Sequence, residues 1–232
     1  MKDYWLHRDF PELDYEGKSI LIIGAGPSTS EVNWENIQVD FIWSCNDFYL
    51  NKRLLNVELD LVSMGNLQDY NNQQLDEYLN KHNTRILIEE NHMRRETLHN
   101  NSTFFKKYKD RCVEGSVDKE YTGIVGPPAR LLTLACVLGA SNVYYVGVDG
   151  FDKNLKNVHA FTNEDGLRGG AAHNTYERYY TSITGFFKRL YDDFGDRVKF
   201  YNLGEASSNH NIPSFVSKDL YPLDEKVLES LG

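Results

Sequence analysis

The sequence has little cysteine and no long apolar run, and both shortages narrow the classes of protein it can belong to. Three cysteines in 232 residues cannot form a disulfide framework, which favours a reducing compartment. No apolar run approaches the ~20 residues that a transmembrane helix needs. Residues 1–14 are aromatic and acidic, without the basic-then-apolar layout of a signal peptide. We therefore expect a cytoplasmic protein.

Positive charge is also scarce. The chain has 25 Lys and Arg against 34 Asp and Glu, which gives a formal net charge of −9. Because nucleic-acid binding needs a basic face, this balance argues against nucleic acid as the main partner, although it leaves room for a local phosphate pocket. The hydrophobic content of 41% is ordinary for a globular protein, and the length favours one domain over residues 1–232.

Short apolar runs alternate along the chain with longer stretches of helical spacing. The runs, which predict strands, are 19–23, 41–44, 59–64, 85–88, 142–148 and 198–203; the helical stretches are 68–81, 127–138 and 174–193. This alternation predicts an α/β fold, a single Rossmann-like doubly wound domain with a mainly parallel sheet. Residues 149–172 have no clear period and include Gly166, Gly169 and Gly170, which indicates a lid segment over the carboxyl edge of the sheet.

A Gly-Ala-Gly-Pro-Ser turn, comprising Gly24, Ala25, Gly26, Pro27 and Ser28, closes the first apolar run. A turn between a buried strand and a helix offers backbone N–H groups to a phosphate. The turn matches half of the dinucleotide fingerprint, but the third glycine is replaced by threonine and the proline removes a donor. We expect a nucleotide site rather than an NAD site; the alternative is a plain tight turn.

Other candidate ligand contacts follow later strands or open a helix. Asn46, after the second run, can read a base or sugar edge, or it can close an Asx turn. Its neighbour Asp47 could contact ribose hydroxyls. Gly126 and Pro127 open the most apolar helical stretch, where they could face a phosphate or simply initiate the helix.

Two kinds of residue could supply catalysis. Asp149, at the end of the run 142–148, could hold a metal, act as a base or cap the following loop. His173 precedes the stretch 174–193, and a helix N-terminus disfavours the imidazolium, which suits a general base; otherwise it is an exposed polar residue. His159, inside the lid segment, competes for that role. No set of histidines, cysteines or acids has clear metal-ligand spacing.

These pieces resemble the bacterial sialyltransferases of glycosyltransferase family 42. The similarity lies in the segments Ile22–Ser28 and Ser44–Tyr49, in Asn66, in Leu138–Asp149 and in His159–Phe161. The resemblance implies that Asn46 contacts a cytidine nucleotide and that Asn66 faces the donor sugar. It also implies that Gly126 and Pro127 lie at a phosphate-facing helix start, and that His173 deprotonates the acceptor hydroxyl.

The match departs from the family at residues that bind the donor. Ala25 stands where the family has a nucleotide-binding Asn, and Pro127 replaces a phosphate-binding Ser. Phe151 and His159 replace two tyrosines that assist the phosphate, and Ile124 falls where the family has Arg. The fold analogy is therefore stronger than the analogy of donor.

The resulting prediction is a glycosyltransferase that moves a sugar from a nucleotide-sugar donor of the CMP type to a glycan acceptor without a metal cofactor. The resemblance also implies proximity to a membrane surface and a homo-oligomer. A second resemblance, to the DUF115 group that includes archaeal 6-hydroxymethylpterin diphosphokinases, rests on the turn Gly24–Ser28, the strand end at Asp149 and the segment Tyr201–Ala206. It implies Mg²⁺ and ATP. A third hypothesis is a nucleotide-binding module that has lost catalysis.

Overall fold

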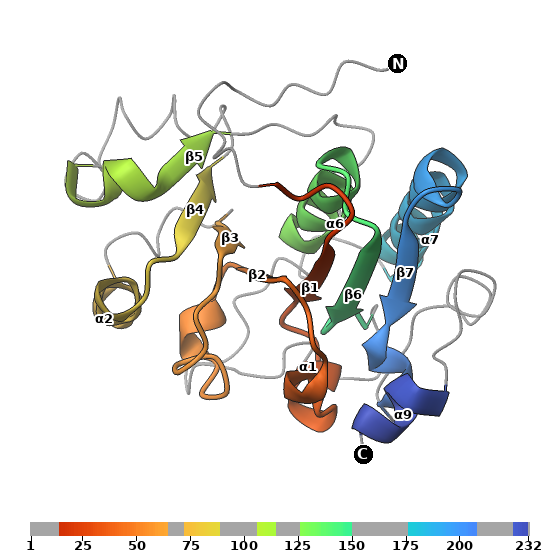
Figure 1. Cartoon of the computed structure of the whole chain (residues 1–232), viewed down its shortest axis with the longest axis horizontal. Helices are drawn as coiled ribbons and strands as arrows, with labels where there is room; N and C mark the ends of the chain where they lie inside the picture. Colours follow the sequence, from red (N-terminus) through yellow and green to blue (C-terminus); the bar gives the residue numbers. More distant parts are fainter. Residues whose placement is uncertain are drawn as a thin grey trace.

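A central sheet of parallel strands organises the protein in a computed structural model (Figure 1). The structure describes residues 14–64, 72–88, 106–114, 126–149, 176–207 and 225–231. The strands are β1 (Ser19–Ile23), β2 (Phe41–Cys45), β3 (Leu61–Ser63), β4 (Arg85–Ile88), β5 (Cys112–Glu114), β6 (Asn142–Val146) and β7 (Lys199–Asn202). Their order in the sheet is β5-β4-β3-β2-β1-β6-β7, and every neighbouring pair is parallel. The predicted α/β, Rossmann-like, doubly wound fold is confirmed.

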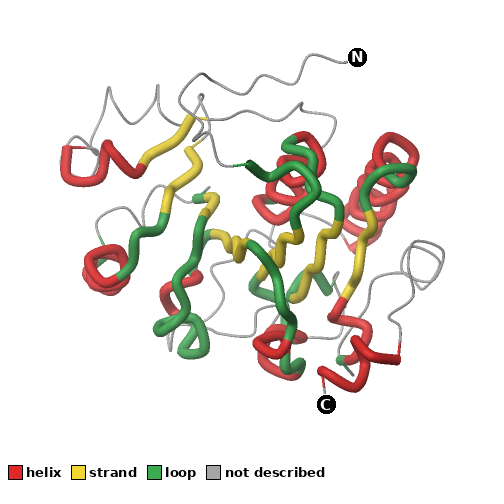
Figure 2. Tube along the Cα trace, in the orientation of Figure 1, coloured by secondary structure: helices red, strands yellow, loops and turns green. Residues whose placement is uncertain are grey.

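Helices lie on both sides of this sheet (Figure 2). The α-helices are α1 (Ser28–Glu31), α2 (Gln73–Lys81), α6 (Pro127–Val137), α7 (Tyr176–Phe194) and α9 (Glu225–Leu231). The short 3₁₀ helices are η1 (Trp34–Asn36), η2 (Phe48–Leu50), η4 (Lys109–Arg111) and η6 (Leu203–Ala206). Among the helices described, none is both long and apolar enough to cross a membrane.

Both faces of the sheet are buried, which explains why its strands read as continuous apolar runs. In β1, Ile20 and Ile22 join the core under α6 and α7, whereas Leu21 and Ile23 join the core on the opposite face. That second core includes side chains of α2, η1 and η2 and the last residue of α9. The alternation follows from the two-residue period of a strand.

The predicted element boundaries differ from the observed ones for local reasons. Strand β5 was not expected, because three residues at a sheet edge carry too short a pattern. Helix α2 begins at Gln73, where the side chain of Asn72 accepts hydrogen bonds from the N–H groups of Gln74 (2.8 Å) and Leu75 (3.3 Å). Strand β6 ends at Val146, since Gly147 has a φ of 71° that an extended strand does not allow.

The segment near the C-terminus packs on the core. Leu231 of α9 is buried, and the side-chain amide of Asn36 donates to the Ser230 carbonyl at 2.7 Å. The lid prediction from residue 150 to residue 172 lies outside the described residues, and the single-domain prediction for residues 1–232 stays a prediction.

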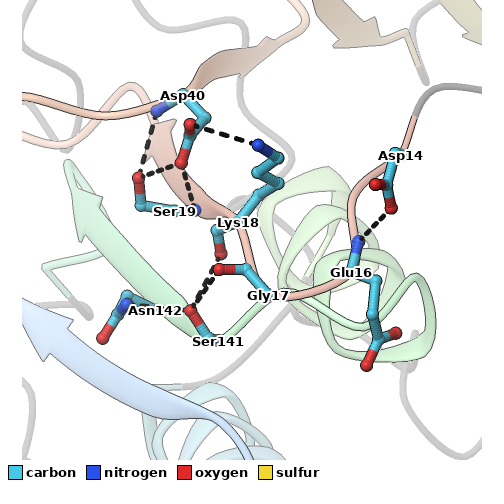
Figure 3. A network of polar contacts seen from close by, with 8 residues as sticks. All are labelled: Asp14, Glu16, Gly17, Lys18, Ser19, Asp40, Ser141 and Asn142. Atoms are coloured by element: carbon cyan, nitrogen blue, oxygen red, sulfur yellow. Dashed lines mark hydrogen bonds and ion pairs between the residues drawn. The ribbon is translucent and has the colours of Figure 1, made fainter.

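The amino-terminal edge of the sheet carries a polar network of its own (Figure 3). The carboxylate of Asp40 accepts from the Ser19 N–H at 2.8 Å and from the Ser19 hydroxyl at 2.7 Å. These hydrogen bonds lower the pKa of Asp40. Nearby, the hydroxyl of Ser141 donates to the Gly17 carbonyl at 2.8 Å, so the segments that precede β1 and β6 are tied together at this edge.

Asp60 lies at the same edge, but its pKa moves in the opposite direction. Burial raises the pKa of its carboxyl group, although Oδ2 accepts a 2.7 Å hydrogen bond from the Ile42 N–H. Ionisation of Asp60 therefore opposes folding, and this cost appears as pH rises above the pKa of the unfolded chain. For Asp40 the sign is reversed, since its stabilising contribution is lost as pH falls through the lowered folded-state pKa.

We expect Asp60→Asn and Asp40→Asn to change stability with opposite pH dependence. The amide introduced by Asp60→Asn keeps an acceptor for the Ile42 N–H and removes the buried charge. The melting temperature of that variant should therefore rise relative to the parent between about pH 3 and pH 7. The melting temperature of the Asp40→Asn variant should fall relative to the parent over that interval. Thermal unfolding in a series of buffers measures both, and parallel curves for the two variants would contradict the assignment.

Candidate functional site

The candidate site lies at the carboxyl edge of the sheet, where β1 separates β2 from β6. The chain runs from β1 outward to β5 and then returns to place β6 on the other side of β1. This reversal is a topological switch point, the place where open α/β sheets bind ligands. Because the strands are parallel, the residues after β1, β2, β6 and β7 share this edge.

The turn after β1 is sealed by backbone hydrogen bonds to the segment after β6. The N–H of Gly24 donates to the Val146 carbonyl at 2.8 Å, and the N–H of Gly26 donates to the Gly147 carbonyl at 2.9 Å. The N–H of Ser28 donates to Oδ2 of Asp149 at 2.7 Å. The expectation that this turn presents bare N–H groups to a phosphate is therefore wrong for these three donors.

Within the turn, only Ala25 and Pro27 are partly exposed; Gly24, Gly26 and Ser28 are buried. Proline has no N–H. Contact between this turn and a ligand stays a prediction, and it now depends chiefly on Ala25 and Pro27. The role that the structure does show for this turn is structural: its hydrogen bonds hold the end of β1 against the end of β6 at the switch point.

Asp149 caps the start of α1, which the sequence did not predict; the expected alternatives were a cap on the loop that follows it, a metal ligand or a base. Its side chain is 4% exposed and accepts from both the N–H and the hydroxyl of Ser28. The Ser28 oxygen in turn accepts from the N–H of Gly147 at 2.8 Å. A carboxylate at the first turn of α1 also complements the partial positive charge of the helix start. The group that fills the expected phosphate position is thus a side chain of the protein itself.

Close backbone packing around Asp149 explains the glycines. A Cβ on Gly26 would lie 2.8 Å from the Gly147 carbonyl oxygen, and one on Gly147 would lie 2.6 Å from the Gly24 carbonyl oxygen. A Cβ on Gly204 would lie 2.9 Å from Oδ1 of Asp149. Thr29, at the position of the missing third glycine, donates its hydroxyl to the Gly24 carbonyl at 2.9 Å. Gly147 and Gly204, not a third glycine in the turn, provide the close approach.

Asn46 follows β2 in a backbone conformation that sequence patterns do not reveal. Asn46 has a φ of 47°, and among the residues that the structure describes it is the non-glycine residue with a positive φ. Asparagine tolerates this left-handed region better than most residues, and such conformations cluster at functional sites. Its N–H donates to the Ser63 carbonyl at 3.0 Å, which leaves the half-buried side chain at the carboxyl edge of β2.

Helix α6 brings its first turn to the same edge, because a helix that connects parallel strands runs antiparallel to them. Gly126 precedes it with a φ of 79° and a ψ of −167°, and Pro127 is the first helical residue. The half-buried Arg130 also lies in this turn. A cation there opposes the helix dipole, and the carboxylate of Asp47 lies in the same neighbourhood.

Arg130, Asp47 and Cys45 are electrostatic neighbours. Burial raises the pKa of the Cys45 thiol to about 12; the charge of Asp47 raises it further, and the charge of Arg130 lowers it. This proximity joins the end of β2 to the start of α6. Sequence reasoning missed Arg130, although a basic residue three positions after the Pro127 helix start is a readable signal.

Three predicted site residues, Asn66, His159 and His173, lie outside the described residues. Their roles as donor-sugar contact and alternative bases stay predictions. In the part of the chain that the structure describes, no group of three or more His, Cys, Asp or Glu side chains could hold a metal ion.

No protein-family model matches this sequence, and no curated protein matches it. Solved structures do match. The α-2,3-sialyltransferase Cst-I from Campylobacter jejuni aligns with a TM-score of 0.53 and 17% identity, over 95% of this chain and 88% of that chain. The C. jejuni sialyltransferase CstII with the substrate analogue cytidine-5′-monophosphate (CMP) gives 0.49 and 14%, over 92% and 97%. CST-II with a trisaccharide acceptor and CMP gives 0.47 and 14%, over 91% and 98%. At these identities the likeness to Cst-I shows a shared fold.

Proposed function

We propose that the protein is a glycosyltransferase that moves a sugar from a nucleotide-activated donor, of the CMP type, to a sugar acceptor. One observation supports this most directly. At the switch point, the left-handed Asn46 and the cation of Arg130 flank the end of β2 and the start of α6. The fold shared with a sialyltransferase over nearly the whole chain agrees with this activity.

The nucleotide lies in this proposal between β2 and α6. Asn46 offers both a donor and an acceptor to the edge of a base or sugar, and Asp47 offers a carboxylate to ribose hydroxyls. The donor phosphate faces Gly126, Pro127 and Arg130. It cannot use the turn after β1 in the way a dinucleotide would, because Asp149 already accepts from the Ser28 N–H.

Arg130 supplies the main electrostatic contribution in this arrangement. A guanidinium beside the leaving phosphate stabilises the negative charge that develops as the glycosidic bond breaks. Because Pro127 and Pro128 have no N–H groups, the first turn of α6 offers fewer backbone donors than an ordinary helix start. A side-chain cation compensates for that loss. The acceptor hydroxyl is deprotonated by His173 or, in the alternative, His159.

We expect CMP to stabilise the folded protein in a manner that depends on Arg130. A ligand at about 100 times its Kd adds about 2.7 kcal/mol, which for this chain length raises the melting temperature by roughly 5–10 °C. The experiment is a thermal-shift series with CMP, CDP, UDP, GDP, ATP and NAD, each with and without Mg²⁺. Arg130→Gln should weaken CMP binding about 10- to 100-fold, because it removes a charge-assisted hydrogen bond.

Arg189→Gln is the matched control, since it makes the same charge change on the exposed side of α7. It should leave the CMP shift intact. Equal losses in both variants would remove Arg130 from the site. Stabilisation by ATP only with Mg²⁺ would favour the diphosphokinase alternative, and CMP binding without turnover of any sugar donor would favour a binding module.

A further inference from the structure

Two buried polar atoms near the carboxyl ends of β6 and β7 have no hydrogen-bond partner among the described residues. They are Oε1 of Glu205, in η6, and the hydroxyl oxygen of Thr184, in α7. Buried polar atoms in folded proteins are nearly always paired with protein, water or ligand. These two therefore need an explanation that the fold alone does not give.

The backbone around Glu205 is held firmly in place. The N–H of Gly204 donates to the Asn202 side chain at 3.1 Å, and the N–H of Ser207 donates to the Gly204 carbonyl at 2.9 Å. Gly204 packs so closely on Asp149 and Ser28 that a Cβ would lie about 3 Å from both side chains. The hydrogen-bonded cluster at the switch point thus fixes where η6 presents the Glu205 side chain.

Glu205 and Thr184 lie toward Tyr145, on the α7 side of β6. The Tyr145 ring stacks on Phe187 of α7 with centroids 5.5 Å apart. Thr184 precedes Phe187 by three residues and shares its face of the helix, one turn nearer the carboxyl edge of the sheet. Burial first, and then the negative charge of Glu205, raise the pKa of the Tyr145 hydroxyl, which agrees with their proximity.

The chemistry of this group suits a neutral, hydroxyl-rich ligand. A carboxylate oxygen accepts from hydroxyl groups, while a threonine hydroxyl both donates and accepts. An anion would be repelled by Glu205. Glu205 and Thr184 are each partly exposed as residues, although the two unpaired oxygens themselves are buried.

We propose that Glu205 and Thr184 bind hydroxyl groups of the neutral acceptor sugar, beside the buried hydroxyl of Tyr145. This assignment rests on the proposed glycosyl transfer. The strand order supports a division of the site, because β7 lies three positions from β2, or roughly 14 Å at about 4.8 Å per strand. Asn46 and Glu205 then lie at opposite ends of the candidate site. A nucleotide bound at Asn46 leaves the Glu205 end for the acceptor sugar.

The test measures lactose, as a neutral sugar probe, by titration calorimetry with and without saturating CMP. Glu205→Gln should raise the Kd for lactose about 10- to 100-fold, and Thr184→Val about 3- to 10-fold. Thr184→Ser keeps the hydroxyl and should restore binding. None of these variants should change the Kd for CMP by more than about twofold, which is within the uncertainty of such measurements.

Stability without ligand gives a second readout. Glu31 accepts a hydrogen bond from the Ser207 hydroxyl, so Glu31→Gln should lower the melting temperature, whereas Glu205→Gln should not. Absence of lactose binding to the parent protein, or an equal fall in melting temperature for both glutamine variants, overturns the proposal. Lactose binding that persists while CMP fails to bind would contradict the proposed donor and leave the sugar site in place.

Discussion

Replacement of Gly147 by alanine should lower the free energy of unfolding by about 3–5 kcal/mol. Two costs add at this position. The φ of 71° is strained for any residue with a Cβ, and that Cβ would lie 2.6 Å from the Gly24 carbonyl oxygen, besides meeting the Thr29 hydroxyl. Neither neighbour can withdraw easily, because the Gly24 carbonyl accepts from Thr29 and the turn is bonded to β6. Chemical unfolding monitored by circular dichroism measures the loss.

Gly17→Ala separates the two costs. Gly17 has nearly the same φ, 70°, but a Cβ there would meet no atom within 4 Å. We therefore expect a loss of only about 1–2 kcal/mol, the cost of the left-handed conformation alone. The difference between the variants measures the close approach of the β1 turn to β6. Equal losses would show that the two segments are not packed as closely as described.

The second large effect is expected for Asp149→Ala, with a loss of about 3–5 kcal/mol. The substitution leaves the buried N–H and hydroxyl of Ser28 without their acceptor. Asp149→Asn should lose less, because the amide oxygen can still accept from the Ser28 N–H. Asp192→Ala is the control: this exposed carboxylate pairs with Lys188 at 2.7 Å, and its removal should cost no more than about 0.5 kcal/mol.

A double-mutant cycle tests whether Asp149 and Ser28 act as one unit. Ser28→Ala removes the shared hydroxyl, so the losses for the two substitutions should be non-additive by about 1–2 kcal/mol. If Asp149→Ala instead abolished activity with an unchanged free energy of unfolding, the carboxylate would act on the substrate and its capping role would be minor.

The elements were predictable where side-chain pattern alone decides them. The run Ser19–Ile23 became β1 and the stretch 127–138 became α6, because each buries an apolar set that no other local conformation could bury as well. The edge strand β5 was not predicted, because a strand of three residues is too short to show a period. The first residue of α2 was not predicted either, because it depends on a cap formed by a single side chain, that of Asn72.

The candidate site was predictable in place but not in contacts. Asn46, Gly126 and Asp149 do lie at the carboxyl edge, as strand-end positions in a parallel sheet must. Their partners could not be read from the sequence. Ser28 and Asp149 are 121 residues apart, and no local pattern says that one will cap the other. Likewise, Arg130 and Glu205 could not be recognised as candidate site residues from the sequence, because their neighbours lie on other elements of the fold.

The sequence by itself determined the parallel α/β architecture and which residues lie at the carboxyl edge of the sheet, because burial periodicity and strand-end glycines are local properties. The tertiary structure decided what the turn Gly24–Ser28 does. Once β6 lies against β1, the carbonyl groups of Val146 and Gly147 and the carboxylate of Asp149 accept hydrogen bonds from the N–H groups of that turn. Those N–H groups are then not available to a phosphate. Hydrogen-bond donors are satisfied by whatever acceptor the fold brings near, and that choice depends on contacts between distant segments.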